Sequence, residues 1–504
     1  MTDSGMLEVE RKYDVGEDDE VPVLESLPGV DRVEAPEDES LDALYFDTAG
    51  LALASRGITL RRRTGGHDDG WHLKLPVAVE ERREFTVRLG KDPESVPRRL
   101  RRLVQVHTRD QDLIPVANLQ TRRTIRRLLA ADGTALADFS DDRVDSRTLL
   151  EPMEQATWRE WEVELVDGPK RLLKDADALF AETGHHPSAL PSKLARGLGR
   201  QYPAGEVPAA PPDPTGPASA VLLSYVRHQV EALKKHDPGV RENAADAVHQ
   251  LRVAARRMRS ALASFRKLAD PDVTGSLRAE LQWLAGTVGE ARDTEVMRAR
   301  LLELIGAEPP ELLLGPVANN VEEHFEAAAR RARAKGLAAL KSARYFRLLD
   351  SLDAFLADPP LTDKAGKDAV QTVGRLVSKQ RKRLKKEVRA LDAESSSPAD
   401  DAALHEVRKS AKRLRYAAEA AAPVFGKQAT TLARAAEEIQ EILGDHHDSV
   451  VTRDLLRELA ASGPGTDAFT YGRLHALEQQ AGEESRRNFF RTWSSSPPGP
   501  LRWM

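Results

Sequence analysis

Residues 6–13, Met6-Leu7-Glu8-Val9-Glu10-Arg11-Lys12-Tyr13, have the composition of a β-strand and decide how the N-terminal half is interpreted. Side chains on a strand alternate between its two faces, so Glu8, Glu10 and Lys12 lie on one face. Two carboxylates and an ammonium group suit a site that binds a divalent cation and an anion together. A strand with a solvated charged face would show the same pattern, so the rest of the chain must decide between the two.

Composition limits the alternatives. A chain of 504 residues is expected to form two or more domains. Its net charge of −5 combines 75 basic with 80 acidic residues, so local clustering is more informative than the total. Without cysteine, carboxylates and histidines are the remaining strong metal ligands. The sequence shows neither a signal peptide nor a long apolar run, so we expect a soluble, cytoplasmic protein without membrane contact.

The N-terminal half, residues 1–203, contains short segments with strand character, separated by turn-forming residues. We expect about eight strands. They lie at 8–13, 41–47, 58–63, 71–75, 81–89, 120–128, 135–142 and 158–166. Helices are expected at 93–106 and 170–183, with a further helix starting near Val21.

Charged residues recur at every second position in these strands, as at Arg61 and Arg63, at His72 and Lys74, and at Arg82 and Glu84. An open sheet would expose such a face to water. A closed barrel would turn it inward, where a ligand or opposite charges must compensate it. Inward carboxylates could bind Mg²⁺ or Mn²⁺, and inward Arg and Lys could bind a polyanion.

An ordered set of motifs resembles the CYTH family, the triphosphate tunnel metalloenzymes. Its first member is the Glu-x-Glu-x-Lys motif of Glu8, Glu10 and Lys12. Further matches follow over about residues 5–200, at Tyr45–Thr48, Leu60–Arg63, Trp71–Lys74, Arg82–Glu84, Asp141–Asp142, Glu160–Glu164 and Ser192–Lys193. The resemblance implies an eight-stranded antiparallel tunnel that binds triphosphate-containing substrates with a divalent metal.

The resemblance also implies roles for individual residues. The metal ligands would be Glu8, Glu10, Glu162 and Glu164, and the phosphate-binding residues Lys12, Arg61, Arg63, Lys74, Arg82 and Lys193. Glu10, Glu162 and Lys12 would act in catalysis, with Glu10 or one of the carboxylates in Glu160–Glu164 positioning a water. Thr86 stands where many members have another acid, so one acidic contact is expected to be missing. His67 and His72 are expected to have ordinary structural roles.

Residues 202–217 contain six prolines and no periodic apolar pattern, which predicts an extended linker at 204–217. Residues 218–504 then show helical periodicity without strand signals. We expect an all-α domain. Its helices are predicted at 218–236, 241–268, 275–305, 316–335, 341–357, 363–392, 400–423, 427–445, 447–461 and 467–491.

This helical half contains an internal repeat. His249, Arg252, Arg256 and Arg259 form a stripe along one helix face, and His405, Arg408, Lys412 and Arg415 repeat it at identical spacing. A glycine and an aspartate follow in each copy, Gly289 with Asp293 and Gly444 with Asp448. We expect a pseudo-twofold helical bundle that offers these stripes to a polyanion, with the run 379–386 adding basic surface.

These features resemble the CHAD family, the conserved histidine α-helical domain, over about residues 218–500. The resemblance implies binding of inorganic polyphosphate. Arg292 stands where the second copy has His446 or His447, so the two copies differ in histidine content. A solvated basic face, nucleic acid and a transition metal at His249, His405, His446 and His447 are the alternatives. Few aromatic residues accompany the charges, which disfavours nucleic acid.

Together the halves predict an inorganic triphosphatase that uses Mg²⁺ or Mn²⁺ and carries a polyphosphate-binding domain. One alternative is a polyphosphate-binding scaffold without catalysis. The other is hydrolysis or cyclisation of an organic triphosphate, such as thiamine triphosphate or a nucleotide.

Overall fold

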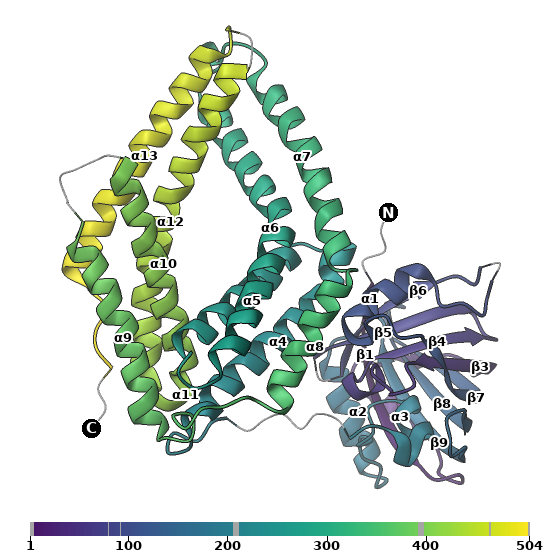
Figure 1. The fold of residues 1–504 in the computed structure, drawn as a ribbon. Coiled ribbons are helices and arrows are strands. Elements are labelled where there is room, and N and C mark those ends of the chain that lie inside the picture. The colour runs from purple at the N-terminus through teal and green to yellow at the C-terminus, as the bar shows by residue number, and fades with distance from the viewer. Residues whose placement is uncertain are drawn as a thin grey trace. The chain divides into compact units, whose positions relative to one another are not determined.

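The computed structural model describes residues 5–78, 80–90, 92–204, 211–391, 398–462 and 465–501. The chain divides into two compact units, Met1–Pro208 and Ala209–Met504 (Figure 1). Of the linker expected at 204–217, residues 205–210 lie outside the described part of the chain. Within that part, no helix is both long and apolar enough to cross a membrane.

The N-terminal unit is a closed antiparallel β-barrel of eight strands, as predicted. The strands follow one another around the barrel in the order β7-β3-β4-β5-β6-β1-β9-β8, and β8 pairs back onto β7. They are β1 (Met6–Val15), β3 (Glu37–Asp47), β4 (Thr59–Thr64), β5 (Gly70–Ala78), β6 (Glu81–Val87), β7 (Ile114–Leu129), β8 (Ala135–Thr148) and β9 (Gln155–Leu165). A two-residue strand, β2 (Arg32–Val33), pairs with one end of β7.

The apolar side chains of these strands pack on the outside of the barrel, under two helices. Tyr13, Phe139 and Trp161 are fully buried with Phe180 of α2 (Arg171–Ala181). Leu60, Trp71 and Leu73 pack in the same way against α1 (Arg98–Thr108). Each such side chain stabilises the fold by about 1.5–3 kcal/mol. Since the apolar faces lie outside, the alternating charged faces point into the barrel.

Two local features of this unit differ from the sequence-based expectation. The helix expected from Val21 is wrong, because that segment forms only a 3₁₀ turn, η1 (Leu24–Ser26), with Leu24 buried. The short helix α3 (Lys193–Leu198) was not predicted. It packs on the inner side of β7 and β8, where a Cβ on Gly197 would lie 3.3 Å from the Cβ of Ser146. Two further 3₁₀ turns are η2 (Ala54–Arg56) and η3 (Gly199–Gln201).

The C-terminal unit is all-helical, as predicted. Its helices are α4 (Ala218–Glu242), α5 (Ala247–Ser264), α6 (Pro271–Ala307), α7 (Val317–Ala339), α8 (Ala343–Ala357), α9 (Ala369–Arg389), α10 (Pro398–Ala420), α11 (Ala422–Phe425), α12 (Lys427–Ser462) and α13 (Ala468–Ser495). A 3₁₀ turn, η4 (Pro310–Leu312), precedes α7. The break expected between residues 445 and 447 is wrong, because α12 is continuous there. The Gly444-Asp445-His446-His447-Asp448 segment contains no proline, and the one glycine is tolerated inside a long helix.

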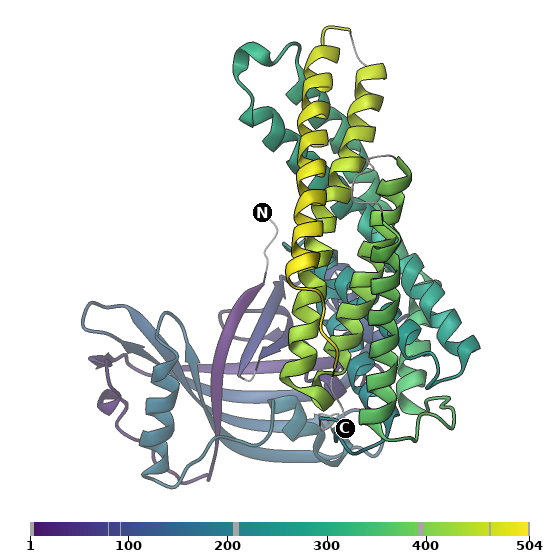
Figure 2. The same cartoon turned by 90° about the vertical axis from the view of Figure 1, so that its left-hand side faces the viewer.

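Two long antiparallel pairs dominate this unit, α6 with α7 and α12 with α13 (Figures 1 and 2). The far ends of both pairs meet in one apolar core that includes Leu301, Val321, Leu456 and Tyr471. At the other end, α5 and α10 contact each other and bring the two copies of the repeat together.

Candidate active site

The tunnel of the barrel contains a cavity with a volume of ≈ 260 Å³. Every tunnel residue expected from the sequence lines it: Glu8, Glu10, Lys12, Arg61, Arg63, Lys74, Arg82, Glu162, Glu164 and Lys193. Antiparallel pairing explains this gathering, because residues directly opposite each other share a face. Glu10 lies opposite Glu164, and Lys12 lies opposite Glu162.

One group of three carboxylates is formed by Glu8, Glu10 and Glu164. Each offers an oxygen, and these oxygens lie within 4.8 Å of one another. Lys74 donates a hydrogen bond to Oε1 of Glu8, whereas Oε2 of Glu8 is buried without a partner. Glu8 is only 4% exposed. Three clustered carboxylates with a buried, unpartnered oxygen fit a divalent cation that prefers oxygen ligands.

Two of the three carboxylates have raised pKa values. Burial raises the pKa of Glu8 above its usual value. Burial and the charge of Glu8 raise the pKa of Glu164 to about 7. Glu10 behaves differently: burial opposes ionisation, but Lys12 and Lys74 lower its pKa far below the usual value. A bound cation would stabilise the ionised form of all three carboxylates.

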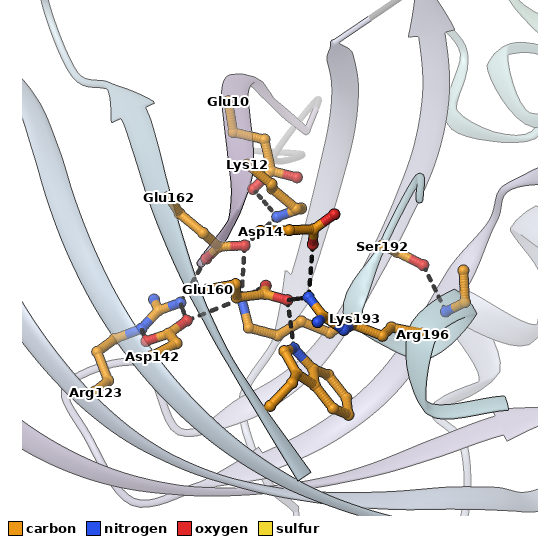
Figure 3. A network of polar contacts seen from close by, with 12 residues as sticks. Glu10, Lys12, Asp14, Arg123, Asp142, Glu160, Glu162, Ser192, Lys193 and Arg196 are labelled. Carbon is orange, nitrogen blue, oxygen red and sulfur yellow. Dashed lines mark hydrogen bonds and ion pairs between the residues drawn. The ribbon is translucent and has the colours of Figure 1, made fainter. Parts of the chain in front are cut away.

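A second group of carboxylates, Asp142, Glu160 and Glu162, surrounds Lys193 (Figure 3). The ammonium group of Lys193 lies 2.9 Å from Asp142, 2.8 Å from Glu160 and 2.6 Å from Glu162. Arg123 adds two parallel hydrogen bonds to Asp142, at 2.7 and 2.6 Å, and one to Glu162 at 2.6 Å. The ammonium group of Lys193 and the guanidinium group of Arg123 therefore already neutralise negative charge on these three carboxylates.

Lys12 connects the two groups. Its ammonium group lies 2.7 Å from Glu10 and also donates a hydrogen bond to Glu162. The sequence placed Glu162 with Glu8, Glu10 and Glu164 as a metal ligand. The structure instead groups Glu162 with Asp142 and Glu160, where it contacts three cationic side chains.

The opposite part of the cavity wall is cationic. Arg61 donates a hydrogen bond of 3.3 Å to the hydroxyl of Tyr45, and Arg63 forms an ion pair with Asp68. Burial and the charges of Arg61 and Arg123 lower the pKa of Arg63 to about 9. Nε of Arg61 and Nε of Arg63 are buried without partners. Crowded guanidinium groups with unused donors suit an anion that carries several negative charges.

His72 and His67, which were expected to have ordinary structural roles, both contact other groups of the protein. Both ring nitrogens of His72 are engaged, Nδ1 with Glu84 and Nε2 with the carbonyl of Asp68, each at 2.9 Å. His67 lies near the cavity, and its Nε2 lies 2.9 Å from Glu37.

Sequence reasoning missed several residues of the site. It quoted Glu84 and Asp142 without assigning them a role, named Glu160 only as one candidate for positioning a water, and omitted Arg123 and Asp138. Arg123 and Arg127 line the cavity from β7, and Asp138 lines it from β8. The signal was present, since these residues also recur at spacings of two or four along their strands.

In the helical unit, α5 and α10 bring together most of the two predicted stripes. Arg252 and Arg256 on α5 lie close to Arg408 and Lys412 on α10, and each lowers the pKa of Lys412. Burial and these charges place the pKa of Lys412 at about 7. Arg252 also pairs with Asp293 at 2.7 Å. Arg408 has no ion pair among the described residues.

The remaining stripe residues are placed differently. Arg259 lines a cavity that Arg256 and Lys412 of this cluster also line, and Arg415 is paired with Glu419 and Glu437. The rings of His405 and His447 lie 4.3 Å apart, and burial with the charges of His405 and Arg408 lowers the pKa of His447 to about 4. In the described part of the chain, sets of three close metal-ligating side chains occur only in the tunnel. His249 lies beside the cluster, where burial lowers its pKa.

Comparison with known proteins agrees with this division. A family model described as CYTH domain matches residues 6–197, and one described as CHAD domain matches residues 224–457. The uncharacterized proteins MT2285 and Rv2226 of Mycobacterium tuberculosis are each 39% identical over 496 residues, covering 95% of this chain and 94% of the relative.

Solved structures similar to this chain include PptA from Streptomyces chartreusis, at 24% identity and a TM-score of 0.47 over 55% of this chain and 100% of that chain. Another is the CHAD domain from the plant Ricinus communis, at 25% identity and a TM-score of 0.47 over 59% of this chain and 100% of that chain.

Proposed function

Because this chain belongs to the family of proteins in which a CYTH domain is followed by a CHAD domain, we propose that its tunnel hydrolyses inorganic triphosphate with Mg²⁺ or Mn²⁺. CYTH proteins include triphosphatases and cyclases that act on phosphoric anhydrides. The observation that carries the proposal is the division of one cavity into a three-carboxylate group and a cationic wall. A phosphate chain with its metal needs both.

The metal would be held by Glu8, Glu10 and Glu164. Their mutual distances, the unpartnered oxygen of Glu8 and the raised pKa values of Glu8 and Glu164 fit an oxygen-liganded divalent ion. When bound, the metal ion would neutralise phosphate charge and favour attack by water.

The protein's own cations would bind and orient the substrate. Arg61 and Arg63 present unused guanidinium donors to the phosphate oxygens. Lys12 lies between the two carboxylate groups and would stabilise charge that develops on the leaving group. Glu162 contacts Lys12, Lys193 and Arg123, which suits a role in orienting these cations. Glu10, which faces the cavity beside Lys12, would position the water.

The lining favours an unsubstituted phosphate chain over thiamine triphosphate or a nucleotide. Apart from the imidazole of His67, which is paired with Glu37, Tyr45 and Ile125 are the only aromatic or large aliphatic side chains among the described lining residues, and Tyr45 is hydrogen-bonded to Arg61. A base or thiazole ring would need an apolar or stacking surface.

A substrate panel tests the tunnel proposal. Purified protein with Mg²⁺ or Mn²⁺ should release phosphate from inorganic triphosphate faster than from ATP or thiamine triphosphate, and a chelator should stop the reaction. Faster turnover of an organic triphosphate would change the substrate class. No release from any of them, combined with tight retention of polyphosphate, would favour the scaffold alternative.

For the helical unit, we propose that the cluster of Arg252, Arg256, Arg408 and Lys412 binds inorganic polyphosphate. Two helices place these cations together, and burial and neighbouring cations lower the pKa values of Arg256 and Lys412. Nε of Arg256 and Nε of Arg408 are buried without hydrogen-bond partners. A linear polyanion would supply the missing negative charge without requiring aromatic contacts. Changing all four to Ala should strongly weaken binding in titration calorimetry and flatten its salt dependence. Unchanged affinity would refute the assignment.

A further inference from the structure

The internal repeat predicts two equivalent grooves beside the α5–α10 contact. Among the described residues, carboxylates neutralise the cations of one groove but not those of the other. The first groove lies between α5, α6 and α10 and has a volume of ≈ 470 Å³. Its lining includes Arg256, Arg259, Arg278, Lys412 and Arg413. Among the described residues, none of these five forms an ion pair. The one lining acid, Glu406, pairs with Lys409 at 2.7 Å.

Three of the arginines that line this groove have a buried donor without a partner. Nε of Arg256, Nε of Arg278 and Nη1 of Arg413 have no hydrogen-bond partner. Burial and the charges of Arg383 and Arg278 lower the pKa of Arg413, and burial and the charge of Arg278 lower the pKa of Arg259. Unsatisfied buried guanidinium donors are costly, and an anion in the groove would satisfy them.

This basic surface continues toward α9. A second cavity of ≈ 210 Å³ shares Arg278 and Arg413 with the first and adds Lys267, Lys379 and Arg383. Arg383 pairs with Glu387 at 2.8 Å, whereas Lys379 belongs to the basic run at 379–386. The two cavities form one path that starts at the α5–α10 cluster and ends beside α9.

Carboxylates occupy the equivalent position in the second copy. Glu419 takes the place of Ala263, and Glu437 takes the place of Gln282. Arg415, the counterpart of Arg259, pairs with Glu419 at 2.8 Å and with Glu437 at 2.7 Å. Glu419 also contacts Arg257 at 3.2 Å and accepts a hydrogen bond of 3.1 Å from Tyr225. The cations on this side are therefore already paired with carboxylates.

We propose that a bound polyphosphate chain extends from the α5–α10 cluster in one direction only, through the groove of Arg278 and Arg413 toward Lys379. We propose further that Glu419 and Glu437 exclude the chain from the equivalent side. The inference rests on the proposed binding of polyphosphate by that cluster. It adds Arg278, Arg413 and Lys379 as binding residues and makes the two glutamates determinants of direction.

Two matched sets of variants test the direction. Arg278→Ala with Arg413→Ala removes charge from the open groove, and Arg257→Ala with Arg415→Ala removes it from the compensated side. In titration calorimetry of the full chain with long-chain polyphosphate, the first pair should weaken binding about tenfold or more and reduce the salt slope by about two. The second pair should change affinity less than about twofold, because its cations do not contact the ligand.

A variant that adds binding surface tests the same point without loss of function. Glu419→Gln with Glu437→Gln should tighten binding of long chains and increase the number of phosphate units covered per protein, read from the calorimetric stoichiometry. Equal losses from the two arginine pairs, or no gain from the glutamine variant, would overturn the direction while leaving polyphosphate binding intact. A wild-type protein that binds no polyphosphate would refute the proposed function and this inference with it.

Discussion

Lys193 is the residue on which the second carboxylate group depends. It lies within 2.9 Å of Asp142, Glu160 and Glu162, and its side chain is 9% exposed. Lys193→Ala would leave buried carboxylates under-compensated and should lower the free energy of unfolding by about 3–5 kcal/mol. Thermal and urea unfolding of the full chain would measure this. Lys170→Ala, which removes an exposed pair with Glu81, should cost less than about 1 kcal/mol. Equal effects of the two changes would contradict the account of Lys193.

The amine of Lys412 should make polyphosphate binding depend on pH. Arg408 on its own helix, Arg252 and Arg256 on α5, and Asp448 on α12 act on this amine, whose pKa is about 7. A polyanion favours the ammonium form, so binding at pH 8 should take up a proton, and affinity should fall as the pH rises above 7. Calorimetry in buffers of different ionisation enthalpy measures this uptake. Lys412→Arg keeps the charge but does not titrate, so an unchanged proton uptake in that variant would contradict the prediction.

The side chains that face the tunnel could be predicted from single strands, because a period of two fixes the face. Glu8, Glu10, Lys12, Arg61 and Arg63 all follow this rule. The division of the tunnel carboxylates into two groups could not be predicted, because it depends on the register between strands. Glu162 lies opposite Lys12, and Glu164 lies opposite Glu10.

On helix α6, two glycines three positions apart should respond to alanine in opposite directions. A Cβ on Gly289 would lie 2.5 Å from Nε of Arg252, so Gly289→Ala would displace Arg252 from Asp293 and destabilise the α5–α6 contact. Gly286 is exposed and has nothing within 4 Å of such a Cβ. Gly286→Ala should therefore stabilise the helix by about 0.5–1 kcal/mol. Melting temperatures measure both changes, and an equal gain from the two would contradict the close approach of Arg252.

The identities of the elements were more predictable than their lengths. The strand predicted at 120–128 begins at Ile114, because the segment from Ile114 to Leu119 pairs with β3 and β8 despite Pro115. Helix α3 has six residues, too few for a periodic apolar pattern, and its packing inside the barrel depends on tertiary contacts. Both features arise from long-range pairing that one segment of sequence does not encode.

At the scale of the whole chain, the two proposed activities should be separable. The tunnel site and the α5–α10 cluster each lie inside one of the two compact units. Arg408→Ala with Lys412→Ala should strongly weaken polyphosphate binding while changing kcat for triphosphate by less than about twofold, because each site is built from residues of its own unit. Steady-state phosphate release measures this. A large fall in kcat would show that the helical unit takes part in turnover.

The most direct test of the central claim compares metal-dependent phosphate release from inorganic triphosphate between the wild-type chain and two glutamine variants. Glu8→Gln with Glu10→Gln keeps the side-chain shape but removes two of the three clustered carboxylates, and should lower kcat about 100-fold or more. Glu25→Gln, an exposed change that does not line the tunnel, should leave kcat unchanged. Full activity in the Glu8 and Glu10 variant, or no metal-dependent release from the wild-type protein, would contradict the account.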